Sequence, residues 1–360
     1  MDKNAKISLP AKVARILNTL GEHGYEAYAV GGCVRDSLLG RTPQDWDITT
    51  SARPEQVKAL FRHTIDTGIQ HGTVTVMLEH EGFEVTTYRI DGEYEDARHP
   101  KEVAFTANLL EDLKRRDFTI NAMAYNEVTG LVDAFDGIGD LERGVIRCVG
   151  NAMERFSEDA LRMLRAVRFA AQLGFSIEQE TQEAIAGLVG NIKKVSAERI
   201  QVELVKLLTS PNPGELKVAY RTGLTAVFLP EFDVMMETPQ NNPHHCCSVG
   251  EHTLKAIEAV PADKVLRLTM LLHDIAKPAC RTADKKGVDH FYGHPARGSE
   301  IARGILRRLK FDNDTTDRVC RLVHWHDDNP ELSGKAVRRA MHRIGVEQYP
   351  ALFAVKRADI

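Results

Sequence analysis

Apolar and polar positions along the chain follow two different periods. Apolar residues at helical spacing over 12–20 (KVARILNTL) predict an amphipathic helix, and the run YEAYAV at 25–30 predicts a strand that leads into Gly31 and Gly32. The glycines precede a short predicted helix that ends at Gly40. Further strands are predicted at 45–50, 72–78 and 83–89, where the residues alternate or are β-branched. The first part of the chain therefore reads as a mixed β-sheet with few helices.

From about residue 150 the period changes to that of helices. The segments 157–174, 177–189 and 197–208 and the regions after 250 are helical in pattern, and strand-like runs are nearly absent. Breaks rich in proline, glycine and asparagine lie at 210–215 and 235–245. We therefore expect an α+β protein, with a mixed-sheet head followed by an all-helical neck, body and third domain. The expected boundaries are 1–150, 151–244 and 245–360.

Composition narrows the class of protein without identifying it. The net charge of −4 argues against coating nucleic acid by bulk charge, although a local basic groove remains compatible with it. No apolar run is long enough for a membrane span, and the N-terminus lacks the apolar core of a secretory signal. The six cysteines are scattered without a CxxC, which favours the reducing cytoplasm over a disulfide framework. The sequence carries no signal for an oligomeric state.

Two aspartates supply the first candidate chemistry. Asp45 and Asp47 are spaced i, i+2 in a predicted strand, so their side chains leave one face about 6 to 7 Å apart and can converge on Mg²⁺. Upstream, Gly31 and Gly32 precede a helix that carries Arg35, a turn at which backbone N–H groups and a guanidinium can hold phosphates. Each half of this pattern also has an interpretation without a function. The two aspartates can simply be solvated, and the two glycines can form a plain strand-to-helix turn. The combination GGCVRDSLLGRTPQDWD is far more specific than either half.

This combination closely resembles the catalytic signature of the class II tRNA nucleotidyltransferase and bacterial poly(A) polymerase family. Family-like motifs follow in order at 86–105, 115–126, 133–147, 157–175 and 197–208. The resemblance implies a nucleotidyltransferase head in which Asp45 and Asp47 bind the catalytic Mg²⁺. It also implies that Gly32, Arg35 and Arg116 contact the nucleotide triphosphate.

A basic stripe in the predicted neck helix is the candidate for base selection. Asp159, Arg162, Arg165 and Arg168 recur every three residues and so share one slowly drifting face. The alternative is a solvated stripe of ion pairs. An enzyme without a nucleic-acid template must read the incoming base with side chains, and a carboxylate with a guanidinium matches a Watson–Crick edge. By resemblance to the family's EDxxR motif, Asp159 and Arg162 are the readers, while Arg165 and Arg168 hold that pair or a phosphate.

The motifs are shared by enzymes that differ in the product they make. The stretch at 91–105 resembles the flexible loop of the CCA-adding members, which favours addition of complete CCA to the 3′ end of tRNA from CTP and ATP. Addition of A alone and poly(A) synthesis stay open as alternatives. Two further hypotheses also stay open, in which the head is not the active part. In one the chain is a metal-dependent phosphohydrolase, and in the other it is an RNA-binding scaffold. No membrane partner is expected.

The last third of the chain holds nine of the 14 histidines. They include an ordered set of histidine and aspartate that resembles an HD-type metal phosphohydrolase domain, which implies a second divalent metal. The expected ligands are His252, His273, Asp274, His294, His324 and Asp359. Each histidine alone reads as structural or exposed, and an HD fold does not by itself imply hydrolysis. The chain stops one residue after Asp359 where family members usually continue, so we expect a truncated sequence.

Overall fold

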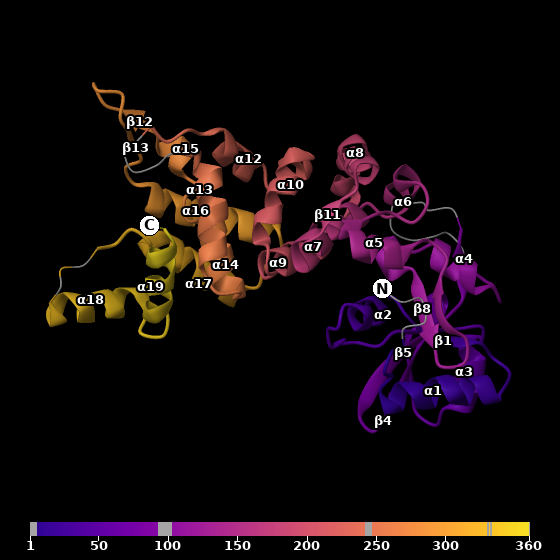
Figure 1. Ribbon diagram of the computed structural model, residues 1–360. Coiled ribbons are helices and arrows are strands. Elements are labelled where there is room, and N and C mark those ends of the chain that lie inside the picture. Colours follow the sequence, from indigo (N-terminus) through magenta and orange to yellow (C-terminus); the bar gives the residue numbers. More distant parts are fainter. Residues whose placement is uncertain (1–5, 93–102, 242–246, 330, 332, 360) are drawn as a thin grey trace. The chain divides into compact units, whose positions relative to one another are not determined.

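The computed structural model describes residues 6–92, 103–241, 247–329, 331 and 333–359 (Figure 1). The contacts group the chain into two compact units. The first comprises Met1–Arg162 and Ser176–Ala184, and the second comprises Met163–Phe175 and Ile185–Ile360.

The first unit is built on a seven-stranded sheet with the order β3-β4-β5-β2-β1-β8-β9. β1 pairs antiparallel with β2 and β8, whereas β2 pairs parallel with β5, so the sheet is mixed, as predicted. The strands are β1 (Ala27–Val30), β2 (Ile48–Thr50), β3 (Thr64–Gly68), β4 (Thr73–Leu78), β5 (Glu81–Thr87), β8 (Met123–Asn126) and β9 (Gly130–Asp133). β6 (Arg89–Asp91) and β7 (Val103–Phe105) form a separate antiparallel pair, and β10 (Val145–Ile146) runs parallel to β11 (Ser176–Ile177).

The first unit also contains six helices and two 3-10 turns within its described residues. They are α1 (Ala11–Glu22), α2 (Gly32–Leu38), α3 (Pro54–Leu60), α4 (Leu109–Lys114), α5 (Gly137–Arg143) and α6 (Ala152–Glu158), with the 3-10 turns η1 (Ile69–His71) and η2 (Thr119–Asn121). The apolar stripe predicted at 12–20 is the buried face of α1, where Val13, Ile16 and Leu20 are fully buried in a core shared with Val74 and Val85. Each such side chain contributes about 1.5 to 3 kcal/mol on burial.

The second unit is almost entirely helical, as the change of period predicted. α7 (Leu161–Leu173) and α8 (Gln179–Leu188) contribute residues to both units. They are followed by α9 (Ala197–Leu208), α10 (Leu216–Arg221), α11 (Leu224–Phe228), α12 (Pro230–Glu237), α13 (Val249–Ala259), α14 (Lys264–Leu272), α15 (Lys277–Cys280), α16 (His294–Arg308), α17 (Asn313–Trp325), α18 (Gly334–Ile344) and α19 (Tyr349–Ala358). The 3-10 turns η3 (Val189–Lys194) and η4 (Pro213–Glu215) and the hairpin of β12 (Thr282–Ala283) and β13 (Asp289–His290) complete it.

Two predicted elements are shorter than the sequence pattern suggested. The strand predicted at 45–50 begins only at Ile48, so Asp45 and Asp47 lie in the segment that leads into β2. The helix predicted at 157–174 is interrupted, because Asp159 has extended backbone angles (φ −135°, ψ 104°). Its carboxylate accepts a hydrogen bond from the Leu161 N–H at 3.0 Å, a local bond that competes with helix continuation and caps α7.

Among the helices of the described ranges, none is both long and apolar enough to span a membrane.

Candidate functional site

The first candidate site lies where β1 ends and β2 begins. The Val30 N–H donates to the Asp47 carbonyl at 3.0 Å, so the antiparallel pairing extends one residue beyond β2. This pairing brings the glycine turn that follows Val30 beside the segment that precedes Ile48 and carries Asp45 and Asp47. The Asp45 and Asp47 side chains are both solvent-accessible. The structure thus brings together the two halves of the predicted signature.

A third carboxylate, Glu84, belongs to this site and was missed by sequence reasoning. β2 and β5 run parallel with Ile48 opposite Val85, so Asp47 and Glu84 stand abreast on the face opposite those buried side chains. The Asp47 side chain reaches solvent, but the surrounding protein partly desolvates its carboxyl and so raises its pKa. The negative charge of Glu84 raises the pKa further, and that of Asp45 does so to a smaller extent. Arg116 opposes this rise. In the sequence, Glu84 looked like an ordinary polar position in an alternating strand, and only the parallel pairing reveals it.

The glycine turn makes room for a guanidinium. Gly31 has φ +82°, and a Cβ at this position would lie 3.3 Å from Nη1 of Arg116. Gly32 begins α2, in which Arg35 is buried and donates from Nη1 to Oδ1 of Asn121 at 2.6 Å. Arg35 and Arg116 are therefore both held at the turn, and the charge of Arg116 acts on the carboxyl of Asp47.

Asp112 holds the segment that carries Arg116. This carboxylate is fully buried in α4, where Arg115 donates to its Oδ1 from Nε and Nη2 at 3.0 and 2.7 Å. Nη2 of Arg116 lies 3.2 Å from its Oδ2, which also accepts from the Thr49 hydroxyl at 3.1 Å. Burial alone would raise the pKa of Asp112, but the two arginines outweigh it and lower the pKa. Arg116 is thus fixed relative to β2 through a residue that carried no signal in the sequence.

Asp159 and Arg162 lie in the first unit, next to the same segment. Arg162 is buried, and its Nη1 donates to Glu158 Oε2 at 2.7 Å. Its Nη2 donates to the carbonyl of Arg115 at 2.9 Å. Arg162, the expected base reader, is therefore hydrogen-bonded to the backbone of Arg115, the residue next to Arg116. Because the helix is interrupted, Asp159 and Arg162 do not belong to one continuous stripe.

Arg165 and Arg168 belong to the second unit. Both guanidiniums lie over the ring of Phe169, at 5.4 and 3.9 Å from its centroid. Arg168 is buried and donates from Nε to Glu203 Oε2 of α9 at 2.5 Å, and from Nη1 to Gln172 at 2.7 Å. The contacts of Arg168 therefore join α7 to α9.

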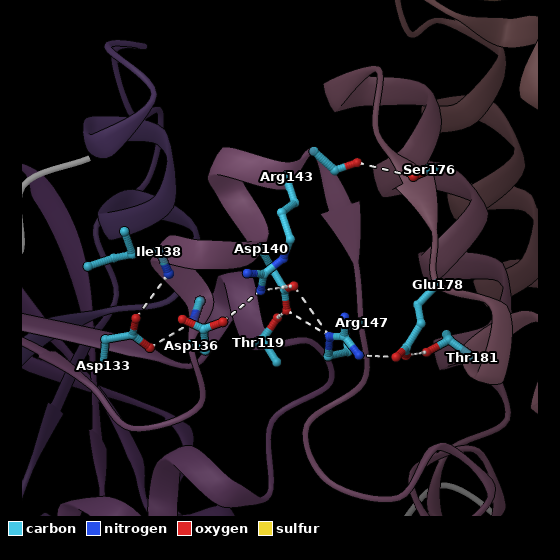
Figure 2. A network of polar contacts seen from close by, with 12 residues as sticks. Thr119, Asp133, Asp136, Ile138, Asp140, Arg143, Arg147, Ser176, Glu178 and Thr181 are labelled. Atoms are coloured by element: carbon cyan, nitrogen blue, oxygen red, sulfur yellow. Dashed lines mark hydrogen bonds and ion pairs between the residues drawn. The ribbon is translucent and has the colours of Figure 1, made fainter.

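A polar network centred on Asp140 connects η2, α5 and the segments that follow β10 and β11 (Figure 2). The buried carboxylate of Asp140 accepts from the Thr119 hydroxyl at 2.7 Å and from Arg143 Nη2 at 2.7 Å. Arg147 also donates to Asp140 and, with its other end, to Glu178, which follows β11. Thr119 starts η2, the turn that contains Asn121. The network therefore holds η2 against α5 and β10.

The second candidate site is a cluster of histidine and aspartate side chains in the second unit. Two sets of possible metal ligands have their ligand atoms within 4.8 Å of one another. One set consists of His252, His273, Asp274 and Asp359, and the other of Asp274, His294 and His326. Asp274 is common to both. Five of the six residues expected from the sequence therefore converge.

His324 is the exception and is corrected by the structure. Its ring packs on Trp325, with centroids 4.5 Å apart, and it belongs to neither ligand set, whereas His326 completes the second set. His326 follows the last turn of α17, and two residues along a helix rotate a side chain by about 200°. The neighbouring histidine therefore points into the cluster.

The ring orientation of the histidines suits metal binding. Nδ1 of His273, His294 and His326 lies 2.7 to 2.8 Å from the backbone carbonyl three residues earlier in each case. A ring that donates from Nδ1 has an unprotonated Nε2 in its neutral form, and this is the usual state of a metal-bound histidine. Nε2 of His294 and Nε2 of His326 face each other at 3.2 Å. If both nitrogens are unprotonated, their lone pairs repel each other at this distance. A proton or a metal cation between the two nitrogens removes this repulsion.

The charges of the cluster also favour a cation. Burial disfavours charge on His273, but Asp274 and Asp359 outweigh burial and raise its pKa to about 10. Burial and the nearby His273 lower the pKa of His326 to about 4. Both oxygens of Asp274 are buried without a well-formed hydrogen bond to any of the residues that the structure describes, although Lys277 Nζ lies 2.7 Å from Oδ2. The donor set of imidazole nitrogens and carboxylate oxygens thus fits a divalent transition metal.

The loop expected to distinguish CCA addition lies largely outside the described residues, because these exclude 93–102.

Comparison with known families matches most of the chain. The model for "Poly A polymerase head domain" matches residues 27–147, that for "Probable RNA and SrmB- binding site of polymerase A" matches 174–236, and that for "HD domain" matches 244–360.

Curated relatives at high identity are named CCA-adding enzymes. That of Leuconostoc mesenteroides subsp. mesenteroides is 53% identical over 207 residues, which are 57% of this chain and 52% of the relative. That of Lactobacillus delbrueckii subsp. bulgaricus is 57% identical over 211 residues, which are 58% and 53% of the two chains. The chain therefore spans about half the length of these relatives.

Solved structures give the same likeness over nearly the whole chain. The Bacillus stearothermophilus CCA-adding enzyme in complex with CTP is 34% identical, with a TM-score of 0.74 over 96% of this chain and 76% of that chain. The Thermotoga maritima CCA-adding enzyme complexed with tRNA is 20% identical, with a TM-score of 0.63 over 97% and 79% of the two chains. The second likeness concerns the fold alone.

Proposed function

The chain belongs to the family of CCA-adding tRNA nucleotidyltransferases and bacterial poly(A) polymerases, and on that basis we propose that it adds CCA to the 3′ end of tRNA. CTP and ATP are the substrates, and no nucleic-acid template is used. We assign residues 1–150 to the catalytic head, 151–244 to a neck and body that select the nucleotide and bind tRNA, and 245–360 to the HD domain.

The observation that carries this proposal is the group of three carboxylates opposite Arg116. Asp45 and Asp47 are the residues that would hold Mg²⁺, with Glu84 beside them. When bound, Mg²⁺ lowers the pKa of an attacking hydroxyl and neutralises charge on the triphosphate. Arg35 and Arg116 at the glycine turn bind and orient the phosphates.

The reaction is one displacement at phosphorus. The oxygen of the terminal tRNA hydroxyl forms a bond to the α-phosphorus, and the bond from that phosphorus to the α–β bridging oxygen breaks. The leaving pyrophosphate takes the electron pair, and the hydroxyl proton passes to solvent. The role of this chain is to position the groups and to stabilise the developing charge.

Asp159 and Arg162 read the base in this proposal. Arg162 lies against the carbonyl of Arg115, beside the arginine that binds phosphate, so base choice and phosphate position are set in one segment. We expect Arg162→Ala to lose the preference for CTP and ATP over UTP and GTP before it loses nucleotidyl transfer. The check is incorporation of each of the four nucleotides into tRNA that lacks its 3′ end. Unchanged selectivity would contradict the reading role.

Product length on a truncated tRNA tests the activity itself. We expect addition of C, C and A and then a stop, since the relatives at 53 to 57% identity are named CCA-adding enzymes. A single A or a long A tail would replace this proposal with one of its two alternatives. Asp45→Ala combined with Asp47→Ala is expected to abolish incorporation, and full activity of that variant would overturn the assignment.

We also place the protein in the cytoplasm. The cysteines within the described ranges are free, which is the state that a reducing compartment maintains.

A second candidate function is metal-dependent hydrolysis of phosphoesters by the HD domain. The convergence of imidazole and carboxylate ligands on Asp274 favours it. Water oxygen would bond to phosphorus, the ester P–O bond would break, and the leaving oxygen would take a proton from the water. Release of inorganic phosphate by the full chain in the presence of Mn²⁺, Co²⁺ or Ni²⁺ tests this activity, with His273→Ala as the variant expected to lose it.

A further inference from the structure

Asn121 of η2 bonds to one of the two arginines that bind phosphate in the proposed function. Its Oδ1 accepts from Nη1 of Arg35 at 2.6 Å, and its Nδ2 donates to Oδ1 of Asp117 at 3.2 Å. All three residues are buried, with 6 to 8% of their surface exposed. The amide therefore lies between a cation and an anion.

The chemistry of these two neighbours admits one orientation of the amide. A guanidinium can only donate hydrogen bonds and a carboxylate can only accept them, so Oδ1 must face Arg35 and Nδ2 must face Asp117. Both bonds have a charged partner, and such bonds are stronger than those between neutral groups. A carboxylate in place of the amide would repel Asp117, and a methyl group would reach neither partner. The position thus requires both the donor and the acceptor of an asparagine.

The backbone around Asn121 is fixed to the glycine turn. The Gly31 N–H donates to the carbonyl of Met123 at 3.1 Å, and the Asn121 carbonyl would lie 3.9 Å from a Cβ at Gly31. Arg35 also donates from Nε to its neighbour Asp36 at 2.9 Å, but that contact moves with α2. The bond to Asn121 instead connects the guanidinium to η2, and so restricts where it lies relative to the turn.

The same contact relates Arg35 to the second phosphate-binding arginine. Asp117 directly follows Arg116 in the chain. Nη1 of Arg116 would lie 3.3 Å from a Cβ at Gly31, and Nη2 of Arg35 would lie 3.6 Å from a Cβ at Gly32. The two guanidiniums therefore stand at adjacent glycines of one turn, and the amide holds the first relative to the segment that carries the second.

We infer that Asn121 is a positioning residue that sets the separation of the Arg35 and Arg116 guanidiniums and thereby the affinity of the head for a triphosphate. Asn121 acts through Arg35 and does not itself bind the nucleotide. The inference rests on the proposed nucleotidyltransferase function, which assigns the phosphates to these arginines. Two guanidiniums held at a set separation can bind two phosphates of one nucleotide without further ordering, whereas a monophosphate offers one.

CTP and cytidine 5′-monophosphate form a matched pair of probes, because they differ only in the β- and γ-phosphates. Calorimetry with the 360-residue chain and Mg²⁺, without tRNA, measures both affinities in the absence of an acceptor. We expect Asn121→Ala to weaken CTP binding by about tenfold and monophosphate binding by less than about twofold. Asn126→Ala is the matched control. It removes an amide of β8 that bonds to Ala27 and to the backbone of its own turn, and should leave both affinities unchanged.

A double-variant cycle with Arg35→Ala separates positioning from a general structural role. Because Asn121 acts through Arg35, Asn121→Ala should have no further effect on CTP affinity once Arg35 is replaced. Additive effects of the two substitutions, or an equal loss of affinity for both nucleotides, would overturn the inference. Asn121→Ser, which shortens the side chain but keeps a polar group, takes the place of Asn121→Ala in the cycle if the alanine variant does not fold.

Tripolyphosphate tests the inference without a nucleoside. We expect the wild-type chain to bind this ion and Asn121→Ala to bind it about tenfold more weakly. If CTP is not incorporated into truncated tRNA, the proposed function fails, while tripolyphosphate binding still decides the inference. Equal affinity of wild type and variant for tripolyphosphate, or no binding by the wild type, would contradict the role of Asn121.

Discussion

Asp112 is the residue on which the geometry of the head site depends most. Its carboxylate is fully buried in α4, pairs with Arg115 and Arg116 directly after that helix, and accepts a hydrogen bond from the Thr49 hydroxyl of β2. A buried charge with several partners is costly to break, because the partners left behind remain desolvated. The position of Arg116 therefore depends on a residue of α4, outside the segment that carries Asp45 and Asp47.

We expect Asp112→Asn to destabilise the head by about 3 to 5 kcal/mol, since it removes one partner of a buried ion pair. Hydrogen exchange of peptides from β2 and α4 measures the local free energy of opening in the full chain. Asp66→Asn is the matched control. It breaks an exposed pair with Lys58, at 2.9 Å, which is worth about 0 to 1 kcal/mol. Equal effects of the two substitutions would contradict this role of Asp112.

The effect of Asp112→Asn should depend on pH. The arginines lower the pKa of Asp112 in the folded protein below its unfolded value of about 3.9. The stabilisation is therefore fully present above that value and is lost as the pH falls through the folded pKa. Hydrogen exchange across this acid range should show the difference between wild type and variant shrinking as the pH falls. A difference that stays constant would show that the charge is not its source.

At the scale of elements, the end of α17 decides which histidine enters the metal-ligand cluster. His324 lies in the last turn of the helix and packs on Trp325, whereas His326 follows the turn and faces His294. The direction in which each side chain leaves the helix therefore decides that His326 is a ligand and that His324 packs on Trp325.

His326→Ala should weaken the binding of Mn²⁺ or Co²⁺ by about tenfold or more, because it removes a nitrogen ligand. His324→Ala changes a histidine on the same helix and should leave metal affinity close to that of wild type. Competition with a fluorescent chelator measures both. Loss of metal in the His324 variant alone would restore the ligand set expected from the sequence.

The buried pair of Arg168 and Glu203 joins α7 to α9. Each single substitution to alanine leaves a buried charge without its partner and should cost about 3 kcal/mol, measured by denaturant unfolding. The double variant should cost less than the sum of the two, with a coupling of about 0.5 to 3 kcal/mol. Additive effects would mean that the two side chains act independently. Arg318→Ala, which breaks an exposed pair with Asp314, is the control for a surface ion pair.

At the scale of the whole molecule, the two candidate sites lie in different compact units. Asp45, Asp47 and Glu84 belong to the first unit, and the metal-ligand cluster belongs to the second. The proposed activities are therefore carried by separate sets of residues.

We expect the two activities to be separable by mutation. Asp45→Ala with Asp47→Ala should abolish nucleotide incorporation and leave phosphoester hydrolysis intact, because those carboxylates are not among the HD ligands. His273→Ala should do the reverse. Assays of both reactions on each purified variant of the chain measure this. Loss of both reactions in either variant would show that the sites depend on each other.

The sequence alone determined the features that depend on local spacing. Apolar residues of α1 recur at helical intervals and α9 occupies its predicted range, because a buried helical face requires that period. The pair Asp45 and Asp47 and the order of histidines after residue 250 were visible for the same reason, since they stand close together or in a recognisable order.

Only the tertiary structure decided which distant residues meet. Glu84 joins Asp47 because β5 pairs with β2 in parallel, and no local pattern encodes a strand's partner. Asp112 and Asp140 are fully buried carboxylates whose partners include residues far away in the sequence. The choice of His326 over His324 depends on where α17 ends and which side of it faces Asp274. Local periodicity thus fixed the elements, while strand pairing and burial selected the side chains that complete each site.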